Sequence, residues 1–158
     1  MNIVILGVGK LKEDWQKDGV KEYLKRLSRY GSYCVEEVDD EPEPKNAGEA
    51  LIRKVTETEG ARILDRIKSD DLVIAMAIKG RMFDSVGLAG ELAEYKRTGK
   101  RIVFVIGGSN GLSEAVLKRA DRKLSFSQLT FPHGLMRVIL LEQLYRAERI
   151  NAGEKYHK

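Results

Sequence analysis

A glycine-rich loop at residues 107–111 is the first place where this sequence could hold a ligand. It follows the apolar run Arg101 to Ile106, a predicted buried strand, and has three glycines in five residues. Glycine has no Cβ, so the backbone can turn sharply and approach a ligand closely. Open α/β sheets bind ligands at the carboxyl ends of their strands, where this loop is predicted to lie. A tight turn into a short helix, which only needs positive φ, explains the spacing equally well.

The stretch from Phe126 to His133 is the second candidate for a site. It mixes aromatic, hydroxyl and amide side chains, and a strongly apolar helix follows it. Backbone polar groups in an irregular segment need partners, and a bound ligand can supply them. The alternative is a buried connection with Pro132 at the helix start. A single histidine such as His133 is more typical of capping or packing than of catalysis.

The segment Gly7-Val8-Gly9 begins like a dinucleotide-binding fingerprint, because a predicted first strand runs into it. The third glycine of that fingerprint, which permits close helix–strand packing, is replaced by Lys12. The pattern therefore favours a plain tight turn. The sequence also contains no Gly-Lys-Ser/Thr motif, which argues against a P-loop and ATP hydrolysis.

Cysteine and histidine are too sparse for a disulfide or a common metal site. Cys34 is the single cysteine, and the two histidines, His133 and His157, lie far apart in the chain. No HExxH spacing occurs, so we expect no bound metal. One unpaired cysteine is typical of the reducing cytosol, and we expect a cytoplasmic protein.

The elements that must position these residues alternate along the chain. At 158 residues, with 42% hydrophobic and 33% charged residues, the chain is expected to form a single globular domain spanning residues 1–158. The alternation predicts an α/β fold with a mainly parallel sheet and helices on both faces. We predict strands at 3–6, 33–38, 72–78, 101–106 and 123–127, and helices at 13–30, 47–68, 84–97, near 113 and at 134–150.

The last predicted helix, residues 134–150, has an apolar arc too wide for one packing face. Such a helix is either central or shared between subunits, and in so small a chain we favour a two-fold dimer interface. The polar tail that follows, residues 151–158, is expected to be frayed. Its Tyr156-His157 pair is either incidental or an arm that folds onto a site.

Charge is distributed unevenly along the chain. Residues 1–100 hold 18 Lys and Arg against 19 Asp and Glu, a net charge of −1, whereas residues 101–158 hold 10 against 5, a net charge of +5. Nucleic acid is a plausible partner for the C-terminal third, although solvated lysines explain the excess as well. No apolar run approaches the roughly 20 residues of a membrane span, and the N-terminus reads as a strand rather than a signal peptide.

Taken in order, these motifs resemble those of the RlmH-type ribosomal RNA large-subunit methyltransferases of the SPOUT class. The resemblance covers essentially the whole chain. The segments that carry it are 9–12, 103–111, 124–133, 136–137, 142–147 and 156–157. It implies a C-terminal trefoil knot that forms the cofactor pocket, a homodimer, and methylation of N3 of a pseudouridine in a large-subunit ribosomal RNA hairpin within the ribosome. The implied methyl donor is S-adenosylmethionine.

The resemblance also implies the site residues by position. The family often has Leu at the position of Met76, a swap that keeps an apolar wall of similar size. Relatives commonly carry a longer side chain at the position of Gly134. The implied cofactor-binding residues are Met76, Gly107, Gly108, Phe126, Ser127, Gln128, Leu129, Thr130 and Phe131.

The reaction itself needs positioning and removal of one proton. A sulfonium methyl group transfers in line to a nitrogen, so no metal is required. The N3–H of pseudouridine lies between two carbonyls, and a nearby histidine or cation would help it to leave. The candidates for substrate handling and catalysis are His157, Tyr156 and Arg137. The alternatives are a non-catalytic ribosome- or RNA-binding α/β protein, or a nucleotide-binding oxidoreductase that uses Gly7-Val8-Gly9.

Overall fold

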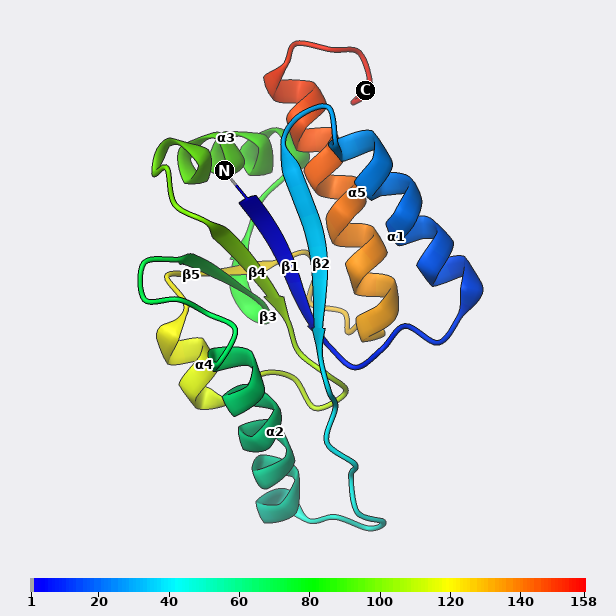
Figure 1. The fold of residues 1–158 in the computed structure, drawn as a ribbon, viewed down its shortest axis with the longest axis vertical. Helices are drawn as coiled ribbons and strands as arrows, with labels where there is room; N and C mark the ends of the chain where they lie inside the picture. The colour runs from blue at the N-terminus through cyan, green and yellow to red at the C-terminus, as the bar shows by residue number, and fades with distance from the viewer. Residues whose placement is uncertain (1) are drawn as a thin grey trace.

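The chain alternates strand and helix from its first element to its last, as the sequence predicts (Figure 1). The structure is a computed structural model that describes residues 2–158. The elements are β1 (Asn2–Val8), α1 (Asp14–Leu27), β2 (Ser32–Val38), α2 (Glu49–Leu64), β3 (Leu72–Met82), α3 (Ser85–Arg97), β4 (Ile102–Ile106), α4 (Glu114–Arg119), β5 (Arg122–Ser125) and α5 (His133–Asn151).

The strands form one five-stranded sheet in the order β2-β1-β4-β3-β5, and every neighbouring pair is parallel. In the centre, Ile5 of β1 lies opposite Phe104 of β4, which in turn lies opposite Ile74 of β3. All five residues of β4 are buried. The continuous apolar run of β4 thus belongs to a strand covered on both faces, as predicted.

Helices cover both faces of the sheet, which confirms the predicted architecture (Figure 1). Because side chains alternate along a strand, Ile5 and Phe104 pack with residues of α1, α3 and α5 on one face. Leu6 and Val105 face the other way and pack with residues of α2 and α4. The carboxyl ends of β1 and β4 therefore open between two helical layers, where ligand sites of such sheets form.

Strand β3 runs four residues further than the predicted end at Ile78. It pairs with β5 twice, because Met76 and Arg81 both lie opposite Leu124 and the intervening residues bulge out of register. A Cβ at Gly80 would lie 2.7 Å from the backbone of Leu124, so a glycine is required there. The bulged part of β3, between Met76 and Arg81, thus packs tightly against β5. The trefoil knot implied by the family resemblance stays a prediction.

Helix α5 is central within one chain, so its wide apolar arc by itself does not indicate a subunit interface. The dimer stays a prediction. The helix packs against α1 and α3 over one face of the sheet. Leu140, Leu141 and Leu144 are fully buried there. The breadth of the arc reflects contacts with several neighbours of the same chain.

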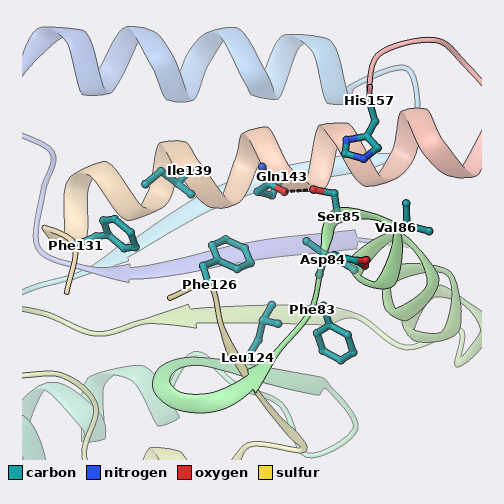
Figure 2. A pocket seen from close by; sticks show the side chains of 11 residues that line it. Phe83, Asp84, Ser85, Val86, Leu124, Phe126, Phe131, Ile139, Gln143 and His157 are labelled. Atoms are coloured by element: carbon teal, nitrogen blue, oxygen red, sulfur yellow. Dashed lines mark hydrogen bonds between the residues drawn. The ribbon is translucent and has the colours of Figure 1, made fainter. Parts of the chain in front are cut away.

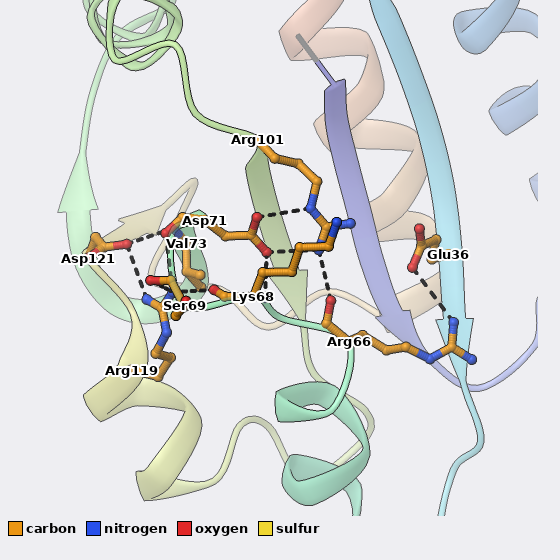
Figure 3. Close-up of polar contacts among 9 residues, drawn as sticks. All are labelled: Glu36, Arg66, Lys68, Ser69, Asp71, Val73, Arg101, Arg119 and Asp121. Atoms are coloured by element: carbon orange, nitrogen blue, oxygen red, sulfur yellow. Dashed lines mark hydrogen bonds and ion pairs between the residues drawn. The ribbon is translucent and has the colours of Figure 1, made fainter.

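The amino ends of β3 and β4 are joined by a network around the buried carboxylate of Asp71 (Figure 3). Arg101 donates to both Asp71 oxygens, from Nε at 3.0 Å and from Nη2 at 2.8 Å. The backbone N–H of Lys68 donates to the same carboxylate at 2.8 Å. Helix α2 ends before this point, at Leu64 rather than at the predicted limit of residue 68. Asp121 accepts from the N–H of Val73 at 2.8 Å and so fixes the start of β5 beside β3.

We expect Asp71→Asn to lower the free energy of unfolding at pH 7 by about 2–3 kcal/mol. The substitution removes the buried negative charge of Asp71 and leaves the partly exposed Arg101 without its partner. Burial alone raises the pKa of Asp71, but the hydrogen bonds from Arg101 and Lys68 and the Arg101 charge bring that pKa below its ordinary value. The stabilisation is therefore present above pH of about 4 and is lost as the pH falls through the lowered pKa. Urea unfolding at several pH values measures this loss.

The exposed neighbour Asp70 supplies the control for this prediction, because Asp70→Asn changes the same charge without touching the network. Equal stabilities of the two variants at pH 7 would contradict the assigned role of Asp71.

Candidate functional site

A pocket of about 480 Å³ lies between the start of α3, the β5–α5 connection and one side of α5 (Figure 2). That volume lies within the range of small-molecule sites. Figure 2 shows Phe131 and Ile139 at one end and Ser85, Gln143 and His157 at the other. The pocket is lined by Phe83, Asp84, Ser85, Val86, Leu88, Leu124, Phe126, Phe131, Ile139, Gln143 and His157.

The polar groups of the pocket are few and mostly engaged. Asp84 caps α3 by accepting from the N–H of Gly87 at 2.7 Å. The hydroxyl of Ser85 donates to the amide oxygen of Gln143 at 3.3 Å, across the gap between α3 and α5. The pocket thus combines aromatic walls with a polar end where His157 stands, an arrangement typical of sites that orient a ligand.

The C-terminal tail is folded back onto α5, and the prediction of a frayed, unanchored tail is wrong. The ring of Tyr156 packs edge-on against Tyr145, with centroids 4.9 Å apart. Its hydroxyl donates to Glu142 at 3.1 Å, and the guanidinium of Arg146 covers its ring at 4.8 Å. The apolar anchor of the tail is therefore Tyr156 itself. The boundary also differs, since Asn151 belongs to α5.

These contacts set the chemical state of the tail residues. Arg146 pairs with Glu142 at 2.6 Å and places Nη1 at 3.3 Å from Nδ1 of His157. A guanidinium can only donate, so Nδ1 of His157 is the acceptor side of this contact and Nε2 is directed elsewhere. Burial, with the neighbouring Glu142 carboxylate, raises the pKa of Tyr156 to about 12, so its hydroxyl is protonated at neutral pH.

The glycine loop after β4 is shaped by its own backbone contacts. Gly108 and Gly111 form a bridge, and Gly111 has φ of +80°. A Cβ on Gly107 would lie 2.7 Å from the carbonyl carbon of Gly111. Gly107 and Gly111 are therefore needed for the turn itself, whether or not the loop binds a ligand. Gly107, Gly108 and Met76 lie outside the lining of the pocket.

The segment between Phe126 and Phe131 forms an exposed turn beside the pocket. The N–H of Leu129 donates to the hydroxyl of Ser127, and Gln128, Leu129 and Thr130 are exposed. Leu129 has 70% of its surface accessible, the largest value among the exposed apolar side chains. Of the residues predicted from sequence, the structure thus brings Phe126, Phe131 and His157 together in one pocket.

Arg137 is completely buried, with no exposed surface. Its Nη2 donates to the carbonyls of Val8 and Gly9 at 2.8 and 2.6 Å. A Cβ at Gly7 would lie 2.6 Å from Nε of this arginine. Gly7 is therefore a glycine because Arg137 lies against it, and the oxidoreductase alternative loses its main feature. Arg137 fixes the carboxyl end of β1 to α5 and is a positioning residue in this arrangement.

His133 is the first residue of α5 and lies near Gly9, outside the pocket lining. Burial, together with the charge of Arg137, lowers the pKa of His133, so the neutral imidazole dominates at pH 7. Its Nδ1 is enclosed without a hydrogen-bond partner within residues 2–158.

Glu59 of α2 is a residue near the glycine loop that the sequence analysis missed. This buried carboxylate accepts from the N–H of Glu41 at 3.0 Å. A Cβ on Gly108 would lie 3.2 Å from its Oε1. Burial raises the pKa of Glu59. The carboxylate holds the acidic loop after β2 against the glycine loop, and no local sequence signal distinguishes it from the exposed glutamates of the same helix.

Within residues 2–158, no three His, Cys, Asp or Glu side chains are grouped so that they could hold a metal ion. The helices described there are too short or too polar to span a lipid bilayer.

The known proteins that this chain resembles are methyltransferases. A family model described as "Predicted SPOUT methyltransferase" matches residues 1–157. Proteins named "Ribosomal RNA large subunit methyltransferase H" from Bacillus thuringiensis (strain Al Hakam) and Bacillus cytotoxicus are each 54% identical over 159 residues, covering 100% of both chains.

Solved structures share the fold at low sequence identity. A probable methylase family protein from Haemophilus influenzae Rd KW20 aligns with a TM-score of 0.53 and 17% identity, over 99% of this chain and 70% of that one. A ribosomal RNA small subunit methyltransferase E from Neisseria gonorrhoeae, bound to S-adenosyl methionine, aligns with a TM-score of 0.50 and 15% identity, over 91% and 65%.

Proposed function

The chain belongs to the SPOUT methyltransferase family, and from this we propose that it transfers a methyl group from S-adenosylmethionine to N3 of a pseudouridine in large-subunit ribosomal RNA. The observation that carries the proposal is the 54% identity, over the full length of both chains, to large-subunit ribosomal RNA methyltransferases. We further propose that the substrate is a hairpin loop of the assembled ribosome.

The residues proposed for cofactor binding suit a sulfonium nucleoside. They are Met76, Gly107 and Gly108, together with the six residues from Phe126 to Phe131. The turn at 127–130 is irregular and exposed, so its backbone groups are available to an adenine edge. The aromatic rings of Phe126 and Phe131 face the pocket, and such rings attract a cation. When bound, S-adenosylmethionine supplies an electrophilic methyl group.

The tail residues are proposed to handle the target base. With Nδ1 facing Arg146, the Nε2–H group of His157 can donate a hydrogen bond to a carbonyl beside N3, and this bond stabilises the anion left when the N3 proton departs to solvent. Arg146 orients the imidazole and adds positive charge nearby. Tyr156 holds the tail on α5 and so keeps His157 at the pocket. Arg137 holds the end of β1 against the start of α5 through its hydrogen bonds to the carbonyls of Val8 and Gly9.

Methylation of ribosomes from a strain that lacks this modification tests the proposal. We expect incorporation of one methyl group from labelled S-adenosylmethionine into large-subunit RNA, and mass analysis of the nucleosides should identify N3-methylpseudouridine. The alternative, a non-catalytic ribosome- or RNA-binding α/β protein, predicts ribosome binding without methyl incorporation. It also predicts no heat on calorimetric titration with S-adenosylmethionine.

We also propose a homodimer, formed by the apolar face around the pocket rather than by the buried leucines of α5. Ile78 and Met82 of β3, Val86 of α3 and Leu129 of the turn before α5 are each at least half exposed, and Val86 also lines the pocket. A second copy of the chain would cover exposed apolar side chains of this kind. We expect sedimentation of the chain at micromolar concentration at about twice its 17.8 kDa mass. Val86→Glu combined with Leu129→Glu should produce folded monomers.

Leu51→Glu provides the matched control for the dimer, because Leu51 is an exposed apolar residue of α2 in the opposite layer. A wild-type chain that sediments as a monomer, or a Leu51→Glu variant that dissociates equally, would contradict the proposed interface.

A further inference from the structure

The edge of the sheet beside the pocket carries four exposed basic residues, Lys79, Arg81, Arg122 and Lys123, which we name the basic edge. The double pairing of β3 with β5 brings them together. Arg81 lies opposite Leu124, next to Lys123, and three of the four line one groove. The backbone of Lys123 is also close to Gly80, the residue after Lys79.

None of these four side chains forms an ion pair with a carboxylate within residues 2–158. Two glutamates of α3, Glu91 and Glu94, line the same groove. Glu94 pairs with Arg97 at 2.9 Å, and Glu91 forms no ion pair with any of the four basic side chains within residues 2–158. The basic edge therefore presents positive charge that no neighbouring carboxylate of the chain takes up.

The basic edge is continuous with the pocket through Phe83. The guanidinium of Arg81 lies 4.5 Å from the centroid of the Phe83 ring. Phe83 lines the pocket on one side and the groove of the basic edge on the other. A polymer whose base entered the pocket would therefore have its neighbouring phosphates within reach of the basic edge.

Protection of an edge strand is the competing explanation for these residues. Charged side chains on an outer strand prevent pairing with other chains, and Arg122 and Lys123 lie on β5 at the edge of the sheet. That explanation does not cover Lys79, which lies within the bulge of β3, or Arg81, where pairing with β5 resumes.

We propose that the basic edge binds the phosphate backbone of the RNA whose base enters the pocket. The inference rests on the proposed function and assigns the RNA-binding surface of the same site. Arginine and lysine bind phosphates without reading sequence, so the basic edge would supply affinity and orientation, while the pocket would select the base.

The test compares the salt dependence of binding to large ribosomal subunits for three proteins. These are the wild type, a basic-edge variant (Lys79→Gln, Arg81→Gln, Arg122→Gln, Lys123→Gln) and a control variant (Lys45→Gln, Arg53→Gln, Lys54→Gln, Lys118→Gln). The control removes four exposed positive charges that form no ion pair within residues 2–158; three lie on α2 and α4, and Lys45 lies in the loop before α2. Each lost phosphate contact should reduce the slope of log K against log salt by roughly 0.7–0.9. The slope for the basic-edge variant should thus be smaller than that of the wild type by about 3, whereas the slope for the control variant should change little.

A second pair of measurements separates phosphate binding from edge protection. Arg122→Glu with Lys123→Glu keeps β5 charged, so this variant should stay soluble and still bind RNA more weakly. The same loss should appear with protein-free large-subunit RNA. Equal losses in the basic-edge and control variants, or a loss seen only with intact particles, would overturn the proposal. Wild-type methylation of ribosomes would stand in either case, so failure of this inference is distinct from failure of the proposed function.

Discussion

Replacing His157 by alanine is expected to slow methyl transfer to ribosomes by about 10²–10³-fold, with little change in S-adenosylmethionine affinity or stability. The magnitude is that of one lost hydrogen-bond donor aimed at developing negative charge. The side chain is exposed and contributes little packing, so folding should not change. Single-turnover methylation measures the rate, and calorimetric titration measures cofactor affinity.

Two further variants decide how His157 acts. A donor role predicts that His157→Gln recovers part of the lost rate, because an amide N–H can replace Nε2–H. A general-base role predicts no recovery and a loss of roughly 10²–10⁴-fold. Full activity of His157→Ala would exclude both roles.

Removal of Tyr156 to Lys158 should cost at least as much activity as His157→Ala, and it should also cost some stability. Tyr156 packs on Tyr145 and bonds to Glu142, so its loss removes part of the cover of α5. His157→Ala is therefore the cleaner measure of the chemical role.

The second large effect is expected at Gly107. Gly107→Val should weaken S-adenosylmethionine binding about 5- to 150-fold, because overpacking typically costs about 1–3 kcal/mol and the loop must shift to relieve it. The added Cβ would lie 2.7 Å from the backbone of Gly111, and backbone atoms cannot move aside as the end of a flexible side chain can. Since the loop lies at the end of β4, the displacement should spare the strand and most of the core.

Gly90→Val is the control for this prediction, since nothing lies within 4 Å of a Cβ placed at Gly90 on α3. Circular dichroism should show both variants folded, and calorimetry should show the affinity loss only for Gly107→Val. A folded Gly107→Val protein with wild-type affinity would refute the assignment of the glycine loop to the cofactor.

Local patterns in the sequence were sufficient for the element types. The apolar runs around Ile5, Ile74 and Phe104 predict buried strands, because side chains of a strand covered on both faces meet no water. Helix boundaries were predicted less well. Helix α2 ends at Leu64 rather than at residue 68. Beyond it, the N–H of Lys68 bonds to Asp71, whose carboxylate also accepts from Arg101, a residue from a distant part of the chain.

The wide apolar arc of α5 shows why one pattern can have two explanations. Burial against α1, α3 and the sheet and burial against a second subunit require the same residue types. The positions of Leu140 and Leu144 inside one chain distinguish the two, and local sequence does not carry that information.

By itself the sequence determined the alternation of strands and helices, the parallel sheet covered on both faces, the glycine loop after β4 and the unusual stretch before α5. Periodicity and glycine content encode these features locally. Tertiary structure alone decided that Gly7 makes room for Arg137, that Glu59 supports Gly108, and that the tail folds back to bring His157 to the pocket. Gly7 and Arg137 are far apart in the chain, and such contacts depend on which distant segments the packed core brings together.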